Sequence, residues 1–473
     1  MNRRFIISLI VFLLFQGSFL IAQTNSYVVT NVTVVPMNRE VSLPNQTVTI
    51  ENGVIRKIES AGKSALPKKA TVIDGTGKYL MPGLMDMHAH FFQEQYDDHH
   101  STTEIELKVM LANGLTTARI LAGHPEFLQA KTNVKTGKWI GPELTIASPQ
   151  LVGRWPWPAE FKNFEVVDTK EKAEAAVRKF KAEGYDEIKI TFMVTREAYD
   201  AIIKTAKEIG IKVTGHVGPQ VKLPAALAAK QQIEHMDEFI DMLLPDTTYN
   251  HGQSVSDMNI WSKKAWATVP YLDESKIPAL ASIVKQSGIS VSPTNYFFLS
   301  SFGEIPSEEF LKQKPDYEYI PRSLKEGRWK NRERYMIMEN SEESLEKYRR
   351  IRKKMVYELW KAGVPLMAGS DSPEFFLLTG FSIHDELETF VKAGLTPFAA
   401  LQTATVNTAS YLGIGKRKGT LEVGKEADLV LLDKNPLEDI RNTRSVKGVV
   451  TKSKWYDAVA VKQLLEEGKQ LGR

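Results

Sequence analysis

Eight short apolar runs alternate with longer helix-like stretches through the middle of the chain, and this alternation restricts the fold more than any other feature. The helix-like stretches include residues 170–184, 196–210 and 344–363, each ending in a glycine of the kind that terminates many helices. Strands separated by helices build a parallel sheet, so the pattern predicts an α/β fold, specifically a (β/α)8 TIM barrel. The runs are GLMDMHAH, GLTTARIL, ELTIAS, EIKITF, KVTGHV, QQIEHM, ISVSPTN and PLMAGSD.

The two ends of the chain carry a different pattern, short runs typical of β-strands broken by turn residues. They occupy residues 27–79 at one end and residues 419–433 and 446–457 at the other. The simplest arrangement pairs both sets in one small β-sandwich domain beside the barrel. The expected division of the mature chain is 81–415 for the barrel and 23–80 with 416–473 for the β-sandwich.

The first residues have the layout of an export signal. Arg3 and Arg4 precede an apolar run from Phe5 to Phe15, and the small residue Ala22 follows at the expected cleavage position. The alternative is a membrane anchor, but the run is too short to cross a hydrocarbon core about 30 Å thick. We therefore expect residues 1–22 to be cleaved as a signal peptide and the protein to be periplasmic or secreted.

Charge and cysteine content limit the partners of the mature chain. The formal net charge of +4 falls to +2 when the two N-terminal arginines are removed, which gives no basis for binding nucleic acid or an acidic membrane. A chain with zero cysteines has neither a thiol nucleophile nor a Cys-ligated metal. We expect a small-molecule substrate and no stable membrane association after signal cleavage, and the sequence leaves a homo-oligomer open.

Metal-ligand side chains recur where the predicted strands end. His88 and His90 are two residues apart, and residues i and i+2 of a strand point to the same side, so one cation can bind both imidazoles. His216, His235 and Asp371 end three further runs, at the face where barrel active sites are built. Each alone would more often be a structural residue, but together they offer nitrogen and oxygen ligands suited to Zn2+ or a similar divalent ion.

Lys189 lies in the run EIKITF, with its ammonium on the side of the strand that would face the barrel interior. An unpaired buried ammonium costs several kcal/mol. Three resolutions stay open: an ion pair with Asp186, Glu187 or another buried acid, a strongly depressed pKa, or reaction with CO2 to a carbamate that bridges two cations as a carboxylate would.

These motifs resemble the amidohydrolase superfamily over nearly all of the mature chain. The segments that carry the resemblance include YLMPGLMDMHAH, MAGSDSP and GTLEVGKEADLVLLDKNPLEDI, and the lysine in YDEIKI is similar to that of the imidazolonepropionase-related and Xaa-Pro dipeptidase-like (prolidase-type) branch. The resemblance implies a TIM barrel with a β-sandwich. It also implies a centre of two divalent metal ions, with Zn2+ expected, bridged by a carboxylated Lys189 and a hydroxide.

Carried over by position, the resemblance places His88, His90 and Asp371 on the more buried metal and His216 and His235 on the second. Asp371 would be the catalytic base that orients the bridging water and passes its proton to the leaving amine. The implied reaction is hydrolysis of an amide C–N bond by metal-bound hydroxide, with dipeptide-like or N-acyl amino-acid substrates.

The substrate pocket departs from the pattern of the superfamily, because the motif after strand five is GHVG where HAHG is common. We expect Arg154 to bind a substrate carboxylate, Tyr296 to bond a substrate carbonyl and His124 to line the mouth of the barrel, although packing or surface roles also explain the last two.

Two alternatives to amide hydrolysis remain. The same dimetal centre would serve a lactonase, a cyclic-imide hydrolase or a deaminase. The alternative from a different class is a metal-free scaffold or binding protein, which would be expected to have lost ligands, whereas all six ligand residues are present.

Overall fold

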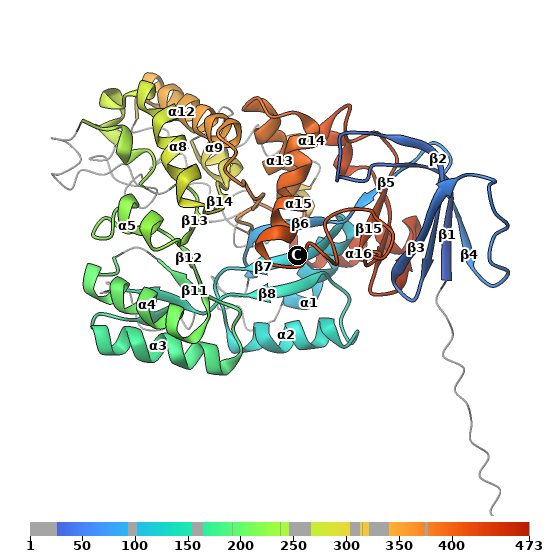
Figure 1. Ribbon diagram of the computed structural model, residues 1–473, viewed down its shortest axis with the longest axis horizontal. Helices are drawn as coiled ribbons and strands as arrows, with labels where there is room; N and C mark the ends of the chain where they lie inside the picture. The colour runs from blue at the N-terminus through green and yellow to red at the C-terminus, as the bar shows by residue number, and fades with distance from the viewer. Residues whose placement is uncertain are drawn as a thin grey trace, which may run out of the picture.

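The fold was analysed in a computed structural model of the chain (Figure 1). The structure describes residues 26–92, 102–153, 164–191, 193–236, 238–245, 266–302, 313–314, 316–320, 340–373 and 377–472. The expected signal peptide at residues 1–22 and the expected carboxylate-binding Arg154 lie outside these ranges.

Seven of the eight predicted central runs form strands, which confirms the expected α/β class with parallel sheets. One sheet has the order β6-β7-β8 and another the order β10-β9-β11-β12-β13-β14. Strands β9 and β10, at one end of the second sheet, were not predicted. The strands are β6 (Leu84–Ala89), β7 (Leu115–Ile120), β8 (Glu143–Ile146), β9 (Gln150–Val152), β10 (Phe164–Val166), β11 (Glu187–Ile190), β12 (Lys212–Gly215), β13 (Gln232–Glu234) and β14 (Val291–Ser292).

The eighth run, residues 365–371, is not a regular strand. Isolated parallel bridges connect it to its neighbours, with Leu366 opposite Val291 and Ser372 opposite Ala89. A third bridge joins Ala147, directly after β8, to Glu187 of β11. These bridges are the links between the two central sheets and the eighth run.

Helices follow the central strands and cover them from outside, with α2, α3 and α4 on one side and α8 and α12 on the other (Figure 1). The three helices predicted from sequence are confirmed. Two of them, α3 and α4, have a threonine N-cap and a left-handed glycine at the C-cap. The helices are α1 (Thr103–Ala112), α2 (Pro125–Lys135), α3 (Lys170–Glu183), α4 (Arg196–Ile209), α5 (Leu223–Ala228), α8 (Ile277–Ser287), α9 (Asn295–Ser301), α12 (Glu342–Lys361), α13 (Ser382–Lys392), α14 (Pro397–Thr403), α15 (Val406–Tyr411) and α16 (Ala458–Gly468).

The strands from both ends of the chain pair in one sheet of eight. Its order is β17-β16-β15-β5-β1-β2-β3, with β4 beside β1, and β15 joins β5 in antiparallel register. A second sheet facing it is not found among the described strands, so the two-layer sandwich stays a prediction. The strands are β1 (Ser26–Val34), β2 (Leu43–Glu51), β3 (Val54–Ser60), β4 (Thr71–Asp74), β5 (Tyr79–Pro82), β15 (Leu429–Leu432), β16 (Val446–Thr451) and β17 (Lys454–Tyr456).

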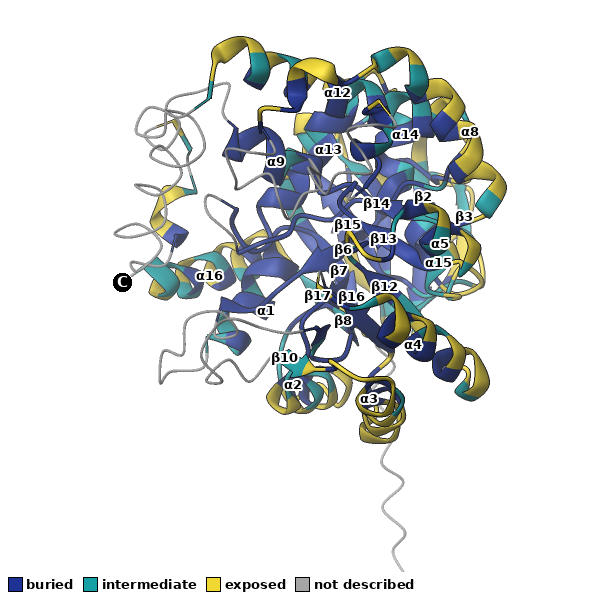
Figure 2. Ribbon diagram, turned by 90° about the vertical axis from the view of Figure 1, so that its left-hand side faces the viewer, coloured by how far each residue is buried: buried dark blue, intermediate teal, exposed yellow. Residues whose placement is uncertain are grey.

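The main apolar core lies between the central strands and the helices, and a separate cluster covers the terminal sheet. Figure 2 shows the central strands buried and the outer helix faces exposed. Trp266, from the segment between β13 and α8, is buried against Phe302 and Tyr348, with ring centroids 5.0 and 5.3 Å away. Within the described residues, no helix is both long and apolar enough to span a bilayer.

Candidate active site

The first part of the site is built where β6 meets the eighth run. The buried carboxylate of Asp86 accepts hydrogen bonds from the backbone N–H of His88 (3.1 Å) and of Ser370 (3.0 Å), and from the Ser370 hydroxyl (2.6 Å). A Cβ on Gly369 would lie 2.6 Å from the Cβ of His88, so only glycine allows this close approach. Asp86 and Gly369 thereby fix the positions of the residues on either side of the site.

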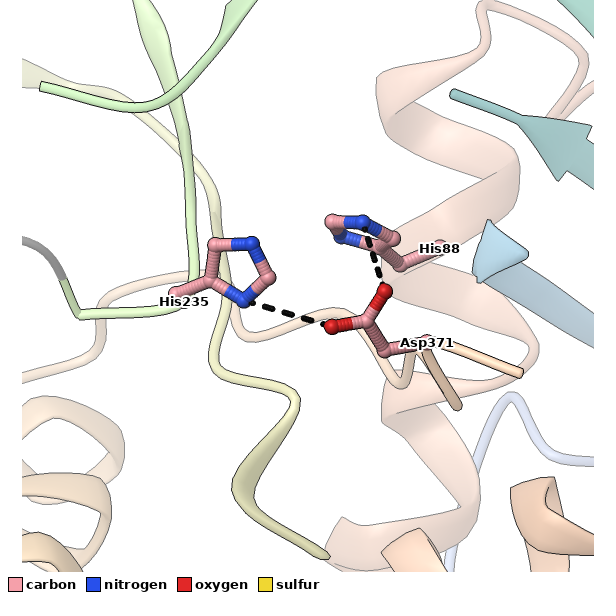
Figure 3. Close-up of side chains that lie close together, drawn as sticks. All are labelled: His88, His235 and Asp371. Carbon is pink, nitrogen blue, oxygen red and sulfur yellow. Dashed lines mark ion pairs between the residues drawn. The ribbon is translucent and has the colours of Figure 1, made fainter. Parts of the chain in front are cut away.

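Asp371 directs its carboxylate among three imidazoles. Its backbone has a left-handed φ of 56°, a strained conformation for a non-glycine residue, and its N–H donates to the carbonyl of His88 at 2.6 Å. Oδ1 lies 3.1 Å from Nε2 of His90 and 3.2 Å from Nε2 of His88, while Oδ2 lies 3.8 Å from Nδ1 of His235. Figure 3 shows the carboxylate between the rings of His88 and His235.

His235 connects this group to the fourth expected histidine, His216. His235 directly follows β13, has a φ of 60°, and its Nδ1 lies 2.6 Å from the hydroxyl of Thr294. Its ring centroid is 4.7 Å from that of His88 and 4.6 Å from that of His216, which follows β12. All four imidazoles expected from the sequence therefore lie side by side at the same end of the central strands.

Lys189 on β11 is 1% exposed, and its positive charge lowers the pKa of His88, His235 and Asp371, so its ammonium lies within electrostatic reach of the histidine cluster. The two acids nearest in sequence bond elsewhere. Asp186 pairs with Lys131 at 2.6 Å and Glu187 with Arg119 at 3.1 Å. Lys189 is thus brought together with the expected metal ligands.

Burial sets the charges of the cluster. It lowers the pKa of His88 to about 4 and that of His235 well below its ordinary value, so both rings are neutral near pH 7. Burial alone would raise the pKa of Asp371, but His88, which is protonated at the low pH where this carboxyl titrates, acts with His90 and Lys189 to lower it to about 2. The cluster therefore offers uncharged imidazoles beside an ionised carboxylate.

This donor set fits a divalent cation of the zinc type. One ligand atom from each of His88, His235 and Asp371 lies within 4.8 Å of the other two, and all three residues are buried. Neutral imidazole nitrogens and a carboxylate oxygen are the ligands that such ions prefer when sulfur is absent.

Three supporting residues were not predicted. Arg119 and Glu234 are buried charged residues that connect to His88, and Thr294 orients His235. Arg119 and Glu234, like Lys189, are charged residues within apolar strand runs, and this pattern could have indicated a buried role for them. Nothing local distinguishes Thr294.

Tyr296 and His124, two of the expected substrate-binding residues, have contacts outside the histidine cluster. Tyr296 is the second residue of α9; its N–H donates to Glu386 at 2.6 Å and its ring centroid lies 4.8 Å from the ammonium of Lys314. His124 is the N-cap of α2, where its Nδ1 accepts from the N–H of Glu126 at 3.4 Å. A role in substrate binding stays a prediction for both residues and for Arg154.

Comparisons with known proteins identify the family. Sequence relatives include imidazolonepropionase of Thermoplasma volcanium, 37% identical over 81 residues, and ochratoxinase of Aspergillus niger, 37% identical over 93 residues. These segments cover 17% and 19% of this chain and only 19% and 18% of the relatives. By fold, the chain is similar to a Xaa-Pro dipeptidase solved with bound methionine, with a TM-score of 0.65, 20% identity, and coverage of 91% of this chain and all of that one (100%).

The family assignment rests on a match to a family model that spans well over half of the chain. Residues 79–456 match the amidohydrolase family, a stretch that begins at β5, includes all six expected ligand residues and ends with β17. The chain therefore belongs to the amidohydrolase family.

Proposed function

We propose that this protein is a metal-dependent hydrolase that cleaves an amide C–N bond in a small molecule. The observation that carries the proposal is the buried set of His88, His235 and Asp371, with ligand atoms within 4.8 Å of one another, in a chain of the amidohydrolase family. A metal-free scaffold would have no need to keep neutral imidazoles packed around an ionised carboxylate.

The framework of this site is proposed to be a closed (β/α)8 barrel of residues 81–415. The bridges Ala147 to Glu187, Val291 to Leu366 and Ala89 to Ser372 support this, since they would join the two central sheets and the eighth run into a ring. The pairing of β5 with β15 supports a second domain made of residues 23–80 and 416–473.

Two divalent ions, with Zn2+ expected, would be held by side chains of this cluster. His88, His90 and Asp371 would bind one and His216 and His235 the other, with Lys189 bridging both after CO2 adds to its amine and a proton is released. When bound, the ions would polarise the scissile carbonyl and lower the pKa of water. The burial of Lys189 beside the histidines supports the bridging role.

Asp371 would move the proton. Its carboxylate, ionised and 6% exposed, would accept a proton from the attacking water on Oδ1 or Oδ2 and deliver it to the nitrogen of the leaving amine. The backbone bond from Asp371 to His88 and the bonds from Ser370 to Asp86 would hold this carboxylate in place through the transfer.

The substrates proposed are dipeptides and N-acyl amino acids. Similarity of fold to a Xaa-Pro dipeptidase and sequence similarity to an ochratoxinase support this class. The test combines metal analysis of protein expressed with added zinc, by plasma mass spectrometry, and a hydrolysis panel of dipeptides and N-acyl amino acids. Lactones, cyclic imides and aminopurines form the other arms.

We expect two zinc equivalents and turnover of at least one amide. Turnover confined to a lactone, cyclic imide or aminopurine would replace the amide by that class. Protein that binds no zinc would refute the proposal. Asp371→Asn, which keeps the shape but removes the proton acceptor, serves as the control for contaminating hydrolases, because it should abolish any turnover that belongs to this site.

The N-terminal layout supports export with loss of residues 1–22. N-terminal sequencing of the protein expressed in a bacterium is expected to start near Gln23. A start at the initiator methionine, with the protein in the cytosol, would contradict export.

A further inference from the structure

Nδ1 of His88 forms a buried contact with the carboxylate of Glu234. Glu234 is the last residue of β13 and lies directly before His235 in the chain, yet its Oε2 is 2.7 Å from Nδ1 of His88 on β6. Neither residue is more than 1% exposed. An ionised carboxylate can only accept hydrogen bonds, so Nδ1 must carry the proton and Nε2 the lone pair.

The second oxygen of Glu234 is held just as firmly. Oε1 accepts from Nη2 of Arg119 at 2.5 Å and from the hydroxyl of Thr214 at 2.7 Å. Both partners of Oε1 are donors, and one of them is a guanidinium, so the buried ion pair with Arg119 keeps Glu234 a carboxylate.

Arg119 is itself anchored across the inside of the central strands. Its Nε donates to the carbonyl of Met87 at 2.6 Å, and its Nη1 donates to Gln232 at 2.9 Å and to Glu187 at 3.1 Å. The side chain is fully buried. A planar guanidinium fixed on three strands leaves Glu234 little freedom to rotate.

We propose that Glu234, held by Arg119, is the positioning residue that sets the tautomer and the orientation of His88 for metal binding. The inference rests on the proposed metal-dependent function and deepens it. In the arrangement observed, Nε2 of His88 faces Oδ1 of Asp371 at 3.2 Å, so the lone pair points to the carboxylate expected to share its metal. Carboxylates behind metal-binding histidines act in this way in many proteins.

Glutamine at position 234 would disturb this arrangement although it has the same shape. If its amide NH2 faced Arg119, two donors would oppose each other. If it faced His88, Nδ1 would have to accept, the proton would move to Nε2, and the metal-binding lone pair would be lost. Either orientation weakens the contribution of His88 to metal binding.

Glu187 provides a matched control. Its Oε2 accepts from the same guanidinium, at 3.1 Å, and its Oε1 accepts from the hydroxyl of Tyr411 at 2.9 Å. Glu187→Gln therefore removes the same charge beside Arg119, but its amide oxygen can still accept from Arg119 while its NH2 donates to the Tyr411 hydroxyl. None of its side-chain hydrogen bonds in the structure goes to a histidine.

The experiment titrates metal-free protein with cobalt chloride and follows the visible absorption of bound Co2+. For Glu234→Gln we expect cobalt binding about 10–100-fold weaker than in the wild-type protein and an altered spectrum. Glu187→Gln should keep both the wild-type affinity and the wild-type spectrum. Equal affinities and spectra for the two variants would overturn the inference.

If Glu234→Gln does not fold, as judged by circular dichroism, Thr214→Val replaces it. This variant removes one donor to Oε1 of Glu234 without changing the charge. It should shift cobalt affinity in the same direction, and wild-type affinity in Thr214→Val would contradict the inference. Wild-type protein that binds no cobalt would overturn the proposed metal-dependent function, which distinguishes that failure from failure of the positioning role alone.

Discussion

Replacing Arg352 by methionine tests whether the helical layer supports the site. Arg352 lies on α12, is fully buried, and donates to the carbonyl of Pro293 at 3.0 Å and to Oδ1 of Asn295 at 3.3 Å. Its guanidinium carbon lies 3.8 Å from the ring centroid of Phe298. Pro293 and Asn295 flank Thr294, whose hydroxyl contacts His235. Arg352 therefore holds the turn that orients a predicted metal ligand.

The structure allows the cost of this substitution to be worked out. Methionine keeps most of the buried apolar volume, so the main loss is that of charged hydrogen bonds, each worth about 1.5–3 kcal/mol. Three acceptors lose their charged donor: the carbonyl of Pro293, Oδ1 of Asn295 and the hydroxyl of Tyr348, which lies 3.1 Å from Nη1. We expect the free energy of unfolding to fall by about 3–5 kcal/mol, because removing the desolvated guanidinium charge offsets part of the loss of these hydrogen bonds.

The assay is urea denaturation of the metal-free protein, followed by circular dichroism, and the matched control is Arg350→Met. Arg350 lies on the same helix, with 59% of its side chain exposed, and pairs with Glu274 at 2.7 Å. An exposed pair of this kind contributes about 0–1 kcal/mol. Equal losses in Arg352→Met and Arg350→Met would refute the reasoning, as would an unchanged zinc affinity in Arg352→Met.

Two further predictions concern the buried His384 on α13 and Lys189, the proposed bridging ligand. Burial lowers the pKa of His384 from 6.5 to about 3, so below pH 6.5 the unfolded chain binds the proton and the folded chain does not; stability is then lost at about 1.4 kcal/mol per pH unit as pH falls toward 3. His384→Asn should remove this part of the pH dependence. Urea denaturation at pH 7 and pH 5 measures the free energy of unfolding of both proteins, and an equal loss between the two pH values in wild type and variant would contradict the prediction. Lys189→Ala should lose the second metal ion and nearly all turnover. Plasma mass spectrometry measures the metal content and the amide assay the turnover, and a variant that keeps both would exclude the bridging role.

The strands and three helices could be predicted because their signals are local. A short apolar run bounded by glycines or helix caps is most easily buried as a strand. Helices α3 and α4 begin after a threonine N-cap and end at a glycine C-cap, and both residues can be read from the sequence. The family resemblance rested on the same motifs and was confirmed by the match over residues 79–456. Strands β9 and β10 were missed because they are three residues long and, unlike the comparably short β13 and β14, do not lie within one of the apolar runs.

The sequence by itself determined which ligand-type residues end the strands, because a period of two places His88 and His90 on one side of β6 and a parallel sheet collects strand ends at one edge. Only the tertiary structure decided which side chains support them. Asp86 and Ser370 are 284 residues apart, Arg119 and Glu234 are 115 apart, and His235 and Thr294 are 59 apart. A hydrogen bond requires atoms about 3 Å apart in a narrow angular range, and no local pattern constrains distances between segments that far apart in the chain.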